Sequence, residues 1–62
     1  MSWTPTEEQK AQAAAVGLQV RPIYGHAMMA GLPEQNGSQT WIGVYSWEDV
    51  QSVALTHLGK TL

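Results

Sequence analysis

The chain has 62 residues, a formal net charge of −2 and no cysteine, so we expect one domain, 1–62, without disulfides, thiolate metal sites or thiol nucleophiles. Three scattered Lys and Arg residues argue against direct binding of nucleic acid, which needs clustered positive charge. No apolar stretch approaches the roughly 20 residues that span a bilayer, and the N-terminus does not resemble a secretory signal. The sequence therefore predicts a soluble, cytoplasmic protein that does not enter membranes.

The first predicted element is a helix that begins after Thr4. Thr4 and Glu7 have the spacing of a capping box, and Pro5 suits the first helical position because its missing N–H has no partner there. Gly17 is the expected left-handed residue that ends the helix, and Leu18 is placed to pack back on it. Most apolar residues of this helix are alanines, which permit close approach of a sheet or of a second copy.

Two strands are predicted next. Residues 18–24 are rich in strand-favouring side chains, and Pro22 among them indicates an edge strand. The following segment, GHAMMAG (25–31), continues this strand or forms a bulge. A turn with Asn36-Gly37 at its tip leads to the second strand, residues 40–45, which is apolar on both faces. One face is expected to pack on the helices and the other to meet solvent or a partner.

A second helix is predicted from Ser46 to Gly59. Ser46 is a good N-cap, and Asp49 stands in the position of the capping-box acid. Tyr45 and Val50 occupy the positions of a hydrophobic staple. At helical spacing, one apolar arc contains Trp47, Val50, Val53, Ala54, His57 and Leu58.

These elements predict an α+β fold in the order helix, strand, strand, helix, with an antiparallel β-hairpin packed against two helices. His57 lies in the middle of the apolar arc. A buried, neutral, hydrogen-bonded histidine is therefore expected there rather than a metal ligand or a general base.

The sequence offers no catalytic constellation, and we expect neither an enzyme nor a cofactor. The adjacent acids Glu48 and Asp49 lie in the first turn of a helix, where capping and the helix dipole already account for them. His26 with Met28 and Met29 has the soft ligands of a copper(I) site but lacks a cysteine or a third well-spaced ligand. No phosphate-binding loop or serine nucleophile motif is present.

The aromatic residues suggest a protein partner instead. Three Trp in 62 residues are more than a domain of this size can bury fully, and Trp and Tyr dominate interface hot spots. The open face of the second strand and the GHAMMAG segment are the best places for a binding surface. Glu48 is added because it has no structural duty beyond the helix dipole. The candidate partner-binding residues are Trp41, Tyr24, His26, Met28, Met29 and Glu48.

In its size, its lack of cysteine and its mixed α and β content, the chain resembles the small inhibitors encoded by bacteriophages and mobile elements, of which anti-CRISPR proteins are the best known. The resemblance lies in size and composition and involves no motif. It implies a non-enzymatic inhibitor that occludes a site on a larger host protein. The alternative is a structural or accessory protein that self-associates as a homodimer, through its edge strand or its alanine-rich helix.

Overall fold

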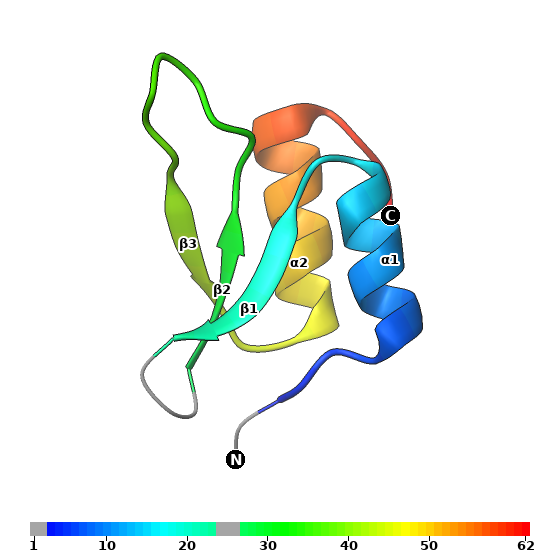
Figure 1. Cartoon of the computed structure of the whole chain (residues 1–62). Helices are drawn as coiled ribbons and strands as arrows, with labels where there is room; N and C mark the ends of the chain where they lie inside the picture. The colour runs from blue at the N-terminus through cyan, green and yellow to red at the C-terminus, as the bar shows by residue number, and fades with distance from the viewer. Residues whose placement is uncertain (1–2, 24–26) are drawn as a thin grey trace.

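The computed structural model of the protein describes residues 3–23 and 27–62. Its elements, in chain order, are α1 (Glu7–Ala15), β1 (Gln19–Ile23), β2 (Ala27–Gly31), β3 (Trp41–Val44), α2 (Trp47–Val53) and a π-helical turn η1 (Ala54–Leu58) (Figure 1). The predicted α+β class is confirmed. The GHAMMAG segment differs from expectation, because its second part forms a strand of its own and the sheet has three strands.

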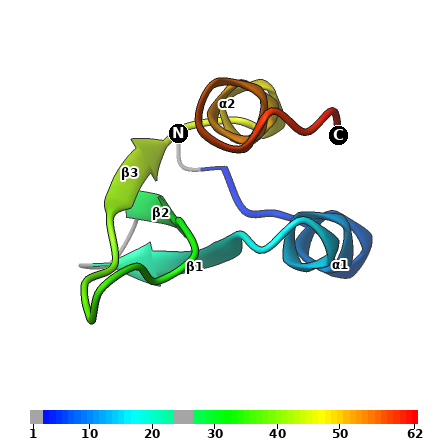
Figure 2. The same cartoon turned by 90° about the horizontal axis from the view of Figure 1, so that it is seen from above.

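The sheet is antiparallel with the order β1-β2-β3, so β2 is central and β1 and β3 are its edges. Val20 lies opposite Ala30, which lies opposite Ile42. Pro22 is thus on an edge strand, as predicted. Seen from above, both helices lie on the same side of the sheet, α1 next to β1 and α2 next to β3 (Figure 2). Among residues 3–23 and 27–62, no helix lies on the other face of the sheet.

Helix α1 begins two residues later than predicted. Thr6 is the N-cap: its hydroxyl accepts the Gln9 N–H at 3.1 Å, and the Gln9 side chain accepts the Thr6 N–H at 3.0 Å. The expected cap at Thr4 is therefore wrong. Glutamine closes a capping box as well as glutamate does, and the later start leaves Pro5 buried in front of the cap rather than in the first turn.

The end of α1 matches the prediction. Gly17 has a φ of +94°, and its N–H donates to the Ala14 carbonyl at 3.0 Å. The Leu18 N–H donates to the Ala13 carbonyl at 2.9 Å, and both side chains are buried. This is the Schellman pattern, in which the residue after the glycine packs on the last turn of the helix.

The turn between β2 and β3 also matches. Asn36 and Gly37 both have positive φ, 54° and 78°. The backbones of the flanking residues Gln35 and Ser38 exchange hydrogen bonds of 2.8 and 2.9 Å. Only residues that tolerate the left-handed region form such a two-residue tip easily, which is why this sequence signal was reliable.

Helix α2 begins at the predicted cap but without the predicted staple. The Ser46 hydroxyl accepts the Asp49 N–H at 3.3 Å. The Asp49 carboxylate accepts the N–H of Tyr45, at 2.8 Å, rather than that of the cap residue. Val50 is fully buried whereas Tyr45 is 80% exposed, so these two side chains do not form a staple.

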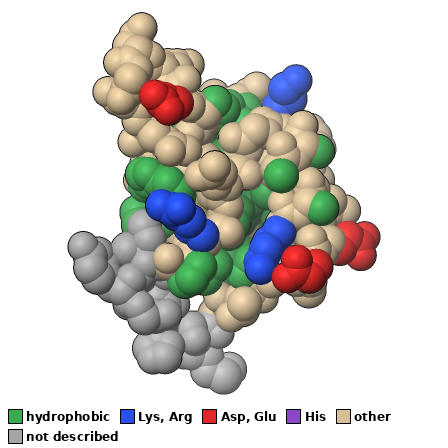
Figure 3. All heavy atoms as spheres, viewed as in Figure 1, with side chains coloured by type: hydrophobic (Ala, Val, Ile, Leu, Met, Phe, Trp, Pro, Cys, Tyr) green, Lys and Arg blue, Asp and Glu red, His purple; other side chains and the backbone are tan. Residues whose placement is uncertain are grey.

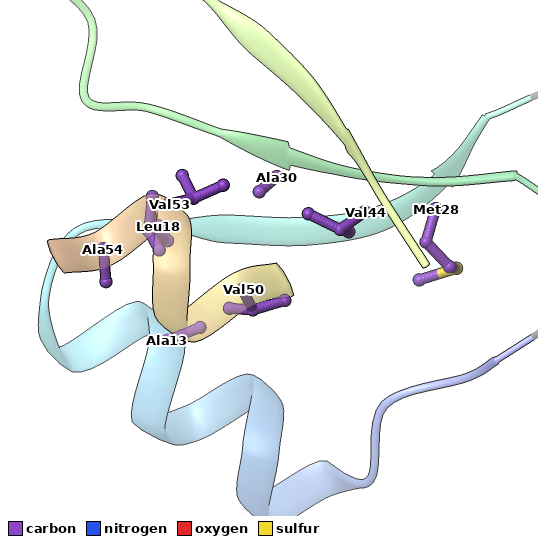
Figure 4. Packing of buried hydrophobic residues seen from close by; sticks show 8 residues of the cluster. All are labelled: Ala13, Leu18, Met28, Ala30, Val44, Val50, Val53 and Ala54. Atoms are coloured by element: carbon purple, nitrogen blue, oxygen red, sulfur yellow. The ribbon is translucent and has the colours of Figure 1, made fainter. Parts of the chain in front are cut away.

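The core lies between the sheet and the helices (Figure 4). Three valines from β3 and α2 and one leucine provide most of its volume, and small alanines let the layers approach closely. Trp47 packs against this core but remains half-buried. The buried hydrophobic residues of the core are Ala13, Leu18, Met28, Ala30, Val44, Val50, Val53 and Ala54.

His57 is exposed, so the expected buried histidine is wrong. The helix widens after Val53 into the π-turn, in which the Gly59 N–H donates to the Ala54 carbonyl five residues before it. Each residue of a π-turn advances by less than the 100° of an α-helix. The wider turn moves Leu58 against the core and carries His57 out of the apolar arc.

Candidate protein-binding face

The open sheet face is the side of the sheet away from the helices. Strand residues alternate between the two faces, and directly opposite residues share a face. Because Ala30 and Val44 point into the core, their neighbours in the strands point the other way. The described positions of the open sheet face are Gln19, Arg21, Met29, Gly31, Trp41 and Gly43, continued beyond β3 by Tyr45.

Trp41 lies across the central strand at Gly31. A Cβ atom built on Gly31 would be 2.8 Å from two carbon atoms of the Trp41 ring and 2.9 Å from the Gln39 side-chain amide. That amide donates to the Leu32 carbonyl at 2.9 Å. The absence of a side chain at Gly31 therefore creates the space that the indole fills, and the backbone and Gln39 hold the ring in place.

Arg21 completes the packing around Trp41 from β1, the edge strand on the other side of β2. Its guanidinium carbon lies 4.7 Å from the centroid of the indole ring, within the range of a cation–π interaction. In Figure 3 a basic side chain lies beside apolar side chains over the sheet, and no acidic side chain is coloured there in this view. The stack fixes the orientation of two large side chains that would otherwise be free to move.

Next to Trp41 along β3, the open sheet face has a second glycine. A Cβ atom on Gly43 would meet only the Tyr45 hydroxyl, at 3.9 Å, so the Tyr45 side chain extends back along the strand. Met29 lies directly opposite Gly43 on β2 and is half-buried. The side chains of Trp41 and Tyr45 thus lie on either side of Gly43, which has no side chain of its own, and Met29 lies next to this open spot.

The described part of the open sheet face contains no Asp, Glu or Lys. Besides Gln19, its large side chains are Arg21, Met29, Trp41 and Tyr45, and these four residue types are enriched at protein interfaces, where Lys, Glu and Asp are depleted. This composition is what distinguishes a binding patch from ordinary surface, because the overall apolar fraction of an interface is close to that of the rest of the surface.

The structure brings two of the candidate partner-binding residues together and separates two others from them. Trp41 and Met29 share the open sheet face. Met28 is only 7% exposed and belongs to the core, because its side chain points to the opposite side of β2. Glu48 is exposed on α2, in the helix layer, where it lines a hollow with Leu55 and Leu62.

The other two candidates, Tyr24 and His26, lie outside the described residues. Sequence reasoning missed Arg21 and Tyr45. Because Arg21 follows Val20 in a strand, alternation predicts that the two side chains lie on opposite faces of the sheet. Only the strand register shows that Arg21 lies next to Trp41. Tyr45 was assigned to a staple, although its even-numbered spacing from Trp41 also fits the open side of the strand.

Elsewhere in the described ranges the structure contains little that could perform chemistry. No three of their His, Asp and Glu side chains lie close enough to hold a metal ion. A polar hollow between the 32–40 loop and η1 is lined by one titratable side chain, His57, together with hydroxyls and amides. None of the helices in residues 3–23 and 27–62 has the length and hydropathy needed to cross a membrane.

Comparisons of the chain with models of protein families, with curated proteins and with solved structures found no match.

Proposed function

We propose that the protein is a non-enzymatic inhibitor that binds a larger host protein through the open sheet face and occludes a site on it. The observation that carries this proposal is the position of Trp41, which lies half-exposed on a helix-free face between Gly31 and Arg21. Large aromatic side chains at the centre of a contact supply most of the binding energy of an interface.

The packing around Trp41 supports a rigid binding site. A side chain that is ordered only on binding costs about 0.5–1.5 kcal/mol of affinity. Trp41 and Arg21 already hold each other in the free protein, so this part of the cost is reduced. A small protein with one rigid face is suited to steric occlusion, because it needs no conformational change to cover its target.

The class of small phage-encoded inhibitors suggests that the host protein is a CRISPR effector in the cytoplasm. The formal net charge of only −2 supports steric contact rather than imitation of nucleic acid, since a mimic needs a dense array of carboxylates. Interference assays in cells that carry such an effector test this assignment. The wild-type protein is expected to restore infection by a targeted phage.

Affinity purification with face variants tests the binding face itself. Tyr45→Ala is the most informative change, because Tyr45 is 80% exposed and its loss leaves the core intact. Leu55→Ala is the matched control, since Leu55 is also an exposed large apolar residue, at 61%, but lies in η1. We expect the partner's affinity to fall about tenfold or more with Tyr45→Ala and to be unchanged with Leu55→Ala.

Two results would contradict the proposal. One is that no partner binds the wild-type protein in stoichiometric amount. The other is that Tyr45→Ala and a Trp41→Ala variant that keeps its fold both bind the partner as well as the wild type, which would place the contact on another surface.

A further inference from the structure

The hydrogen-bond pattern of the sheet determines which backbone groups of β3 remain unpaired. The Leu32 N–H donates to the Thr40 carbonyl at 2.9 Å, one step beyond the β2–β3 register. In an antiparallel ladder, pairs that exchange hydrogen bonds alternate with pairs that do not. Ala30 and Ile42 are therefore a bonded pair, and Trp41 and Gly43 direct their N–H and C=O groups away from β2.

The same reasoning shows that the opposite edge is protected. On β1, the residues that direct their backbone groups outward are Val20 and Pro22, since Arg21 bonds to Met29. Pro22 has no N–H, and the N–H of Leu18 donates to Ala13. Proline at an outward position is a common way to prevent pairing at a sheet edge. The edge of β3 has no such residue.

The open stretch of β3 is short and has a defined end. Tyr45 is the next outward-facing residue, and its N–H is already taken by the Asp49 carboxylate at 2.8 Å. Within residues 3–23 and 27–62, Trp41 and Gly43 have no backbone partner on this side. Each offers one donor and one acceptor, and both residues belong to the open sheet face.

We propose that the edge of β3 binds an extended segment of the partner protein, which adds to the sheet as a fourth strand through the backbones of Trp41 and Gly43. This inference rests on the proposed function and specifies how the partner is bound. Backbone hydrogen bonds provide affinity in such strand addition, and alternate side chains provide specificity. The added strand continues the open sheet face beyond Trp41.

A second copy of the chain is less suited to this edge than an isolated strand. Two antiparallel β3 strands would be related by a two-fold axis about 2.4 Å from each of them, which is half the strand spacing. Helix α2 packs next to β3, and its Val50 shares the core with Val44 (Figures 2 and 4). The two α2 helices would then lie on the same face of the joined sheet, on either side of this axis, where helices need about 8–10 Å between their axes. A single strand without a helix beside it fits.

The position of Gly43 defines the expected segment. On the open sheet face, the segment would lie beside Trp41 and Gly43. A bulky side chain of the segment has room there, over Gly43. On the other face, its side chains lie beside the half-buried Ile42, so they should be apolar. The edge therefore selects an extended segment with apolar residues at every second position and a large residue between them.

Gly43 also provides a matched pair of variants. Gly43→Pro removes the outward N–H and places the proline ring in the path of an added strand, without removing a bond to β2. Gly43→Ala keeps the N–H, and its Cβ fits because the nearest atom is 3.9 Å away. Thermal unfolding of both variants checks that the fold is kept.

The probe is a phage-displayed library of random peptides of about twelve residues, which are long enough to pair along one strand. The library is selected on the immobilised full chain. We expect enriched peptides whose binding falls at least about 100-fold with Gly43→Pro and no more than about tenfold with Gly43→Ala, which keeps the N–H but takes some of the room over the glycine. Hydrogen exchange should slow at the amides of Trp41 and Gly43 when peptide binds.

Three outcomes overturn the inference: no peptide is enriched, the peptides bind Gly43→Pro as well as Gly43→Ala, or the amides of Trp41 and Gly43 keep exchanging freely in the complex. A wild-type dimer that Gly43→Pro dissociates, measured by sedimentation, would instead assign the edge to a second copy. If Tyr45→Ala weakens binding of the host protein but Gly43→Pro does not, the proposed function stands and the strand addition fails.

Discussion

The indole of Trp41 occupies the space that a side chain at Gly31 would need, with ring carbons 2.8 Å from the position of a Gly31 Cβ. The two residues are directly opposite each other on β3 and β2. An aromatic side chain that covers a glycine on the neighbouring strand restores packing that the glycine lacks. This pair therefore links the stability of the sheet to the exposed surface that we propose for binding.

Gly31→Ala should destabilise the protein. The added methyl group collides with the ring and with the Gln39 amide, which is itself hydrogen-bonded to Leu32. Overpacking of this kind costs about 1–3 kcal/mol. Urea unfolding followed by tryptophan fluorescence measures the change. Gly43→Ala is the control and should stay within about 0.5 kcal/mol of the wild type, because its Cβ has room.

Arg21→Gln should weaken the packing of Trp41 without unfolding the chain. The guanidinium lies 4.7 Å from the ring centroid on an exposed surface, where a cation–π contact contributes about 0.5–1 kcal/mol. Arg21→Lys keeps the charge and should recover part of this free energy of unfolding. The chemical shifts of the Trp41 ring protons report the contact directly, and shifts unchanged in Arg21→Gln would show that there is no stack in solution.

Thr6→Ala and Thr4→Ala distinguish the two possible starts of α1. Thr6 caps the helix through its hydroxyl and Thr4 does not. Loss of an N-cap threonine costs about 0.5–2 kcal/mol, whereas an ordinary surface substitution stays within about 0.5 kcal/mol. The denaturant midpoints of the two variants give both changes in the free energy of unfolding, provided that the m-values are equal. A larger loss for Thr4→Ala would return the cap to the earlier position.

His57→Ala should leave the stability almost unchanged, within about 0.5 kcal/mol, because the side chain is exposed at the π-turn. Val50→Ala, in the same helical segment, should cost about 2 kcal/mol or more because Val50 is fully buried. Thermal unfolding of the two variants side by side makes the comparison. An equal loss for both would mean that His57 faces the core as the apolar arc suggests.

Local chemistry was enough to predict several parts of this fold. The left-handed backbone at Gly17 and at Asn36-Gly37 depends only on the residue type at these positions. The cap at Ser46 depends only on an N–H of the next helical turn that needs an acceptor. All three features occur where the sequence predicts them. The expectation that one side of the Trp41 strand packs on helices also holds, because it follows from alternation alone.

The errors that concern the sheet occur where distant parts of the chain compete for the same residues. The strand in residues 27–31 was missed because its small and flexible side chains carry little strand preference, and it is stabilised by pairing on both sides. The single residue step between Met28 and Met29 decides which of them is core and which is surface. Register, not composition, sets that step.

The sequence by itself determined the class of fold, the end of α1, the start of α2 and the surplus of aromatic side chains, because these depend on residue type and short spacing. Only the tertiary structure decided that Arg21 stacks on Trp41, that Gly31 makes room for the ring and that β3 rather than β1 has the open edge. Those relationships join strands through their register, and register is a property of the whole sheet that no single segment of sequence specifies.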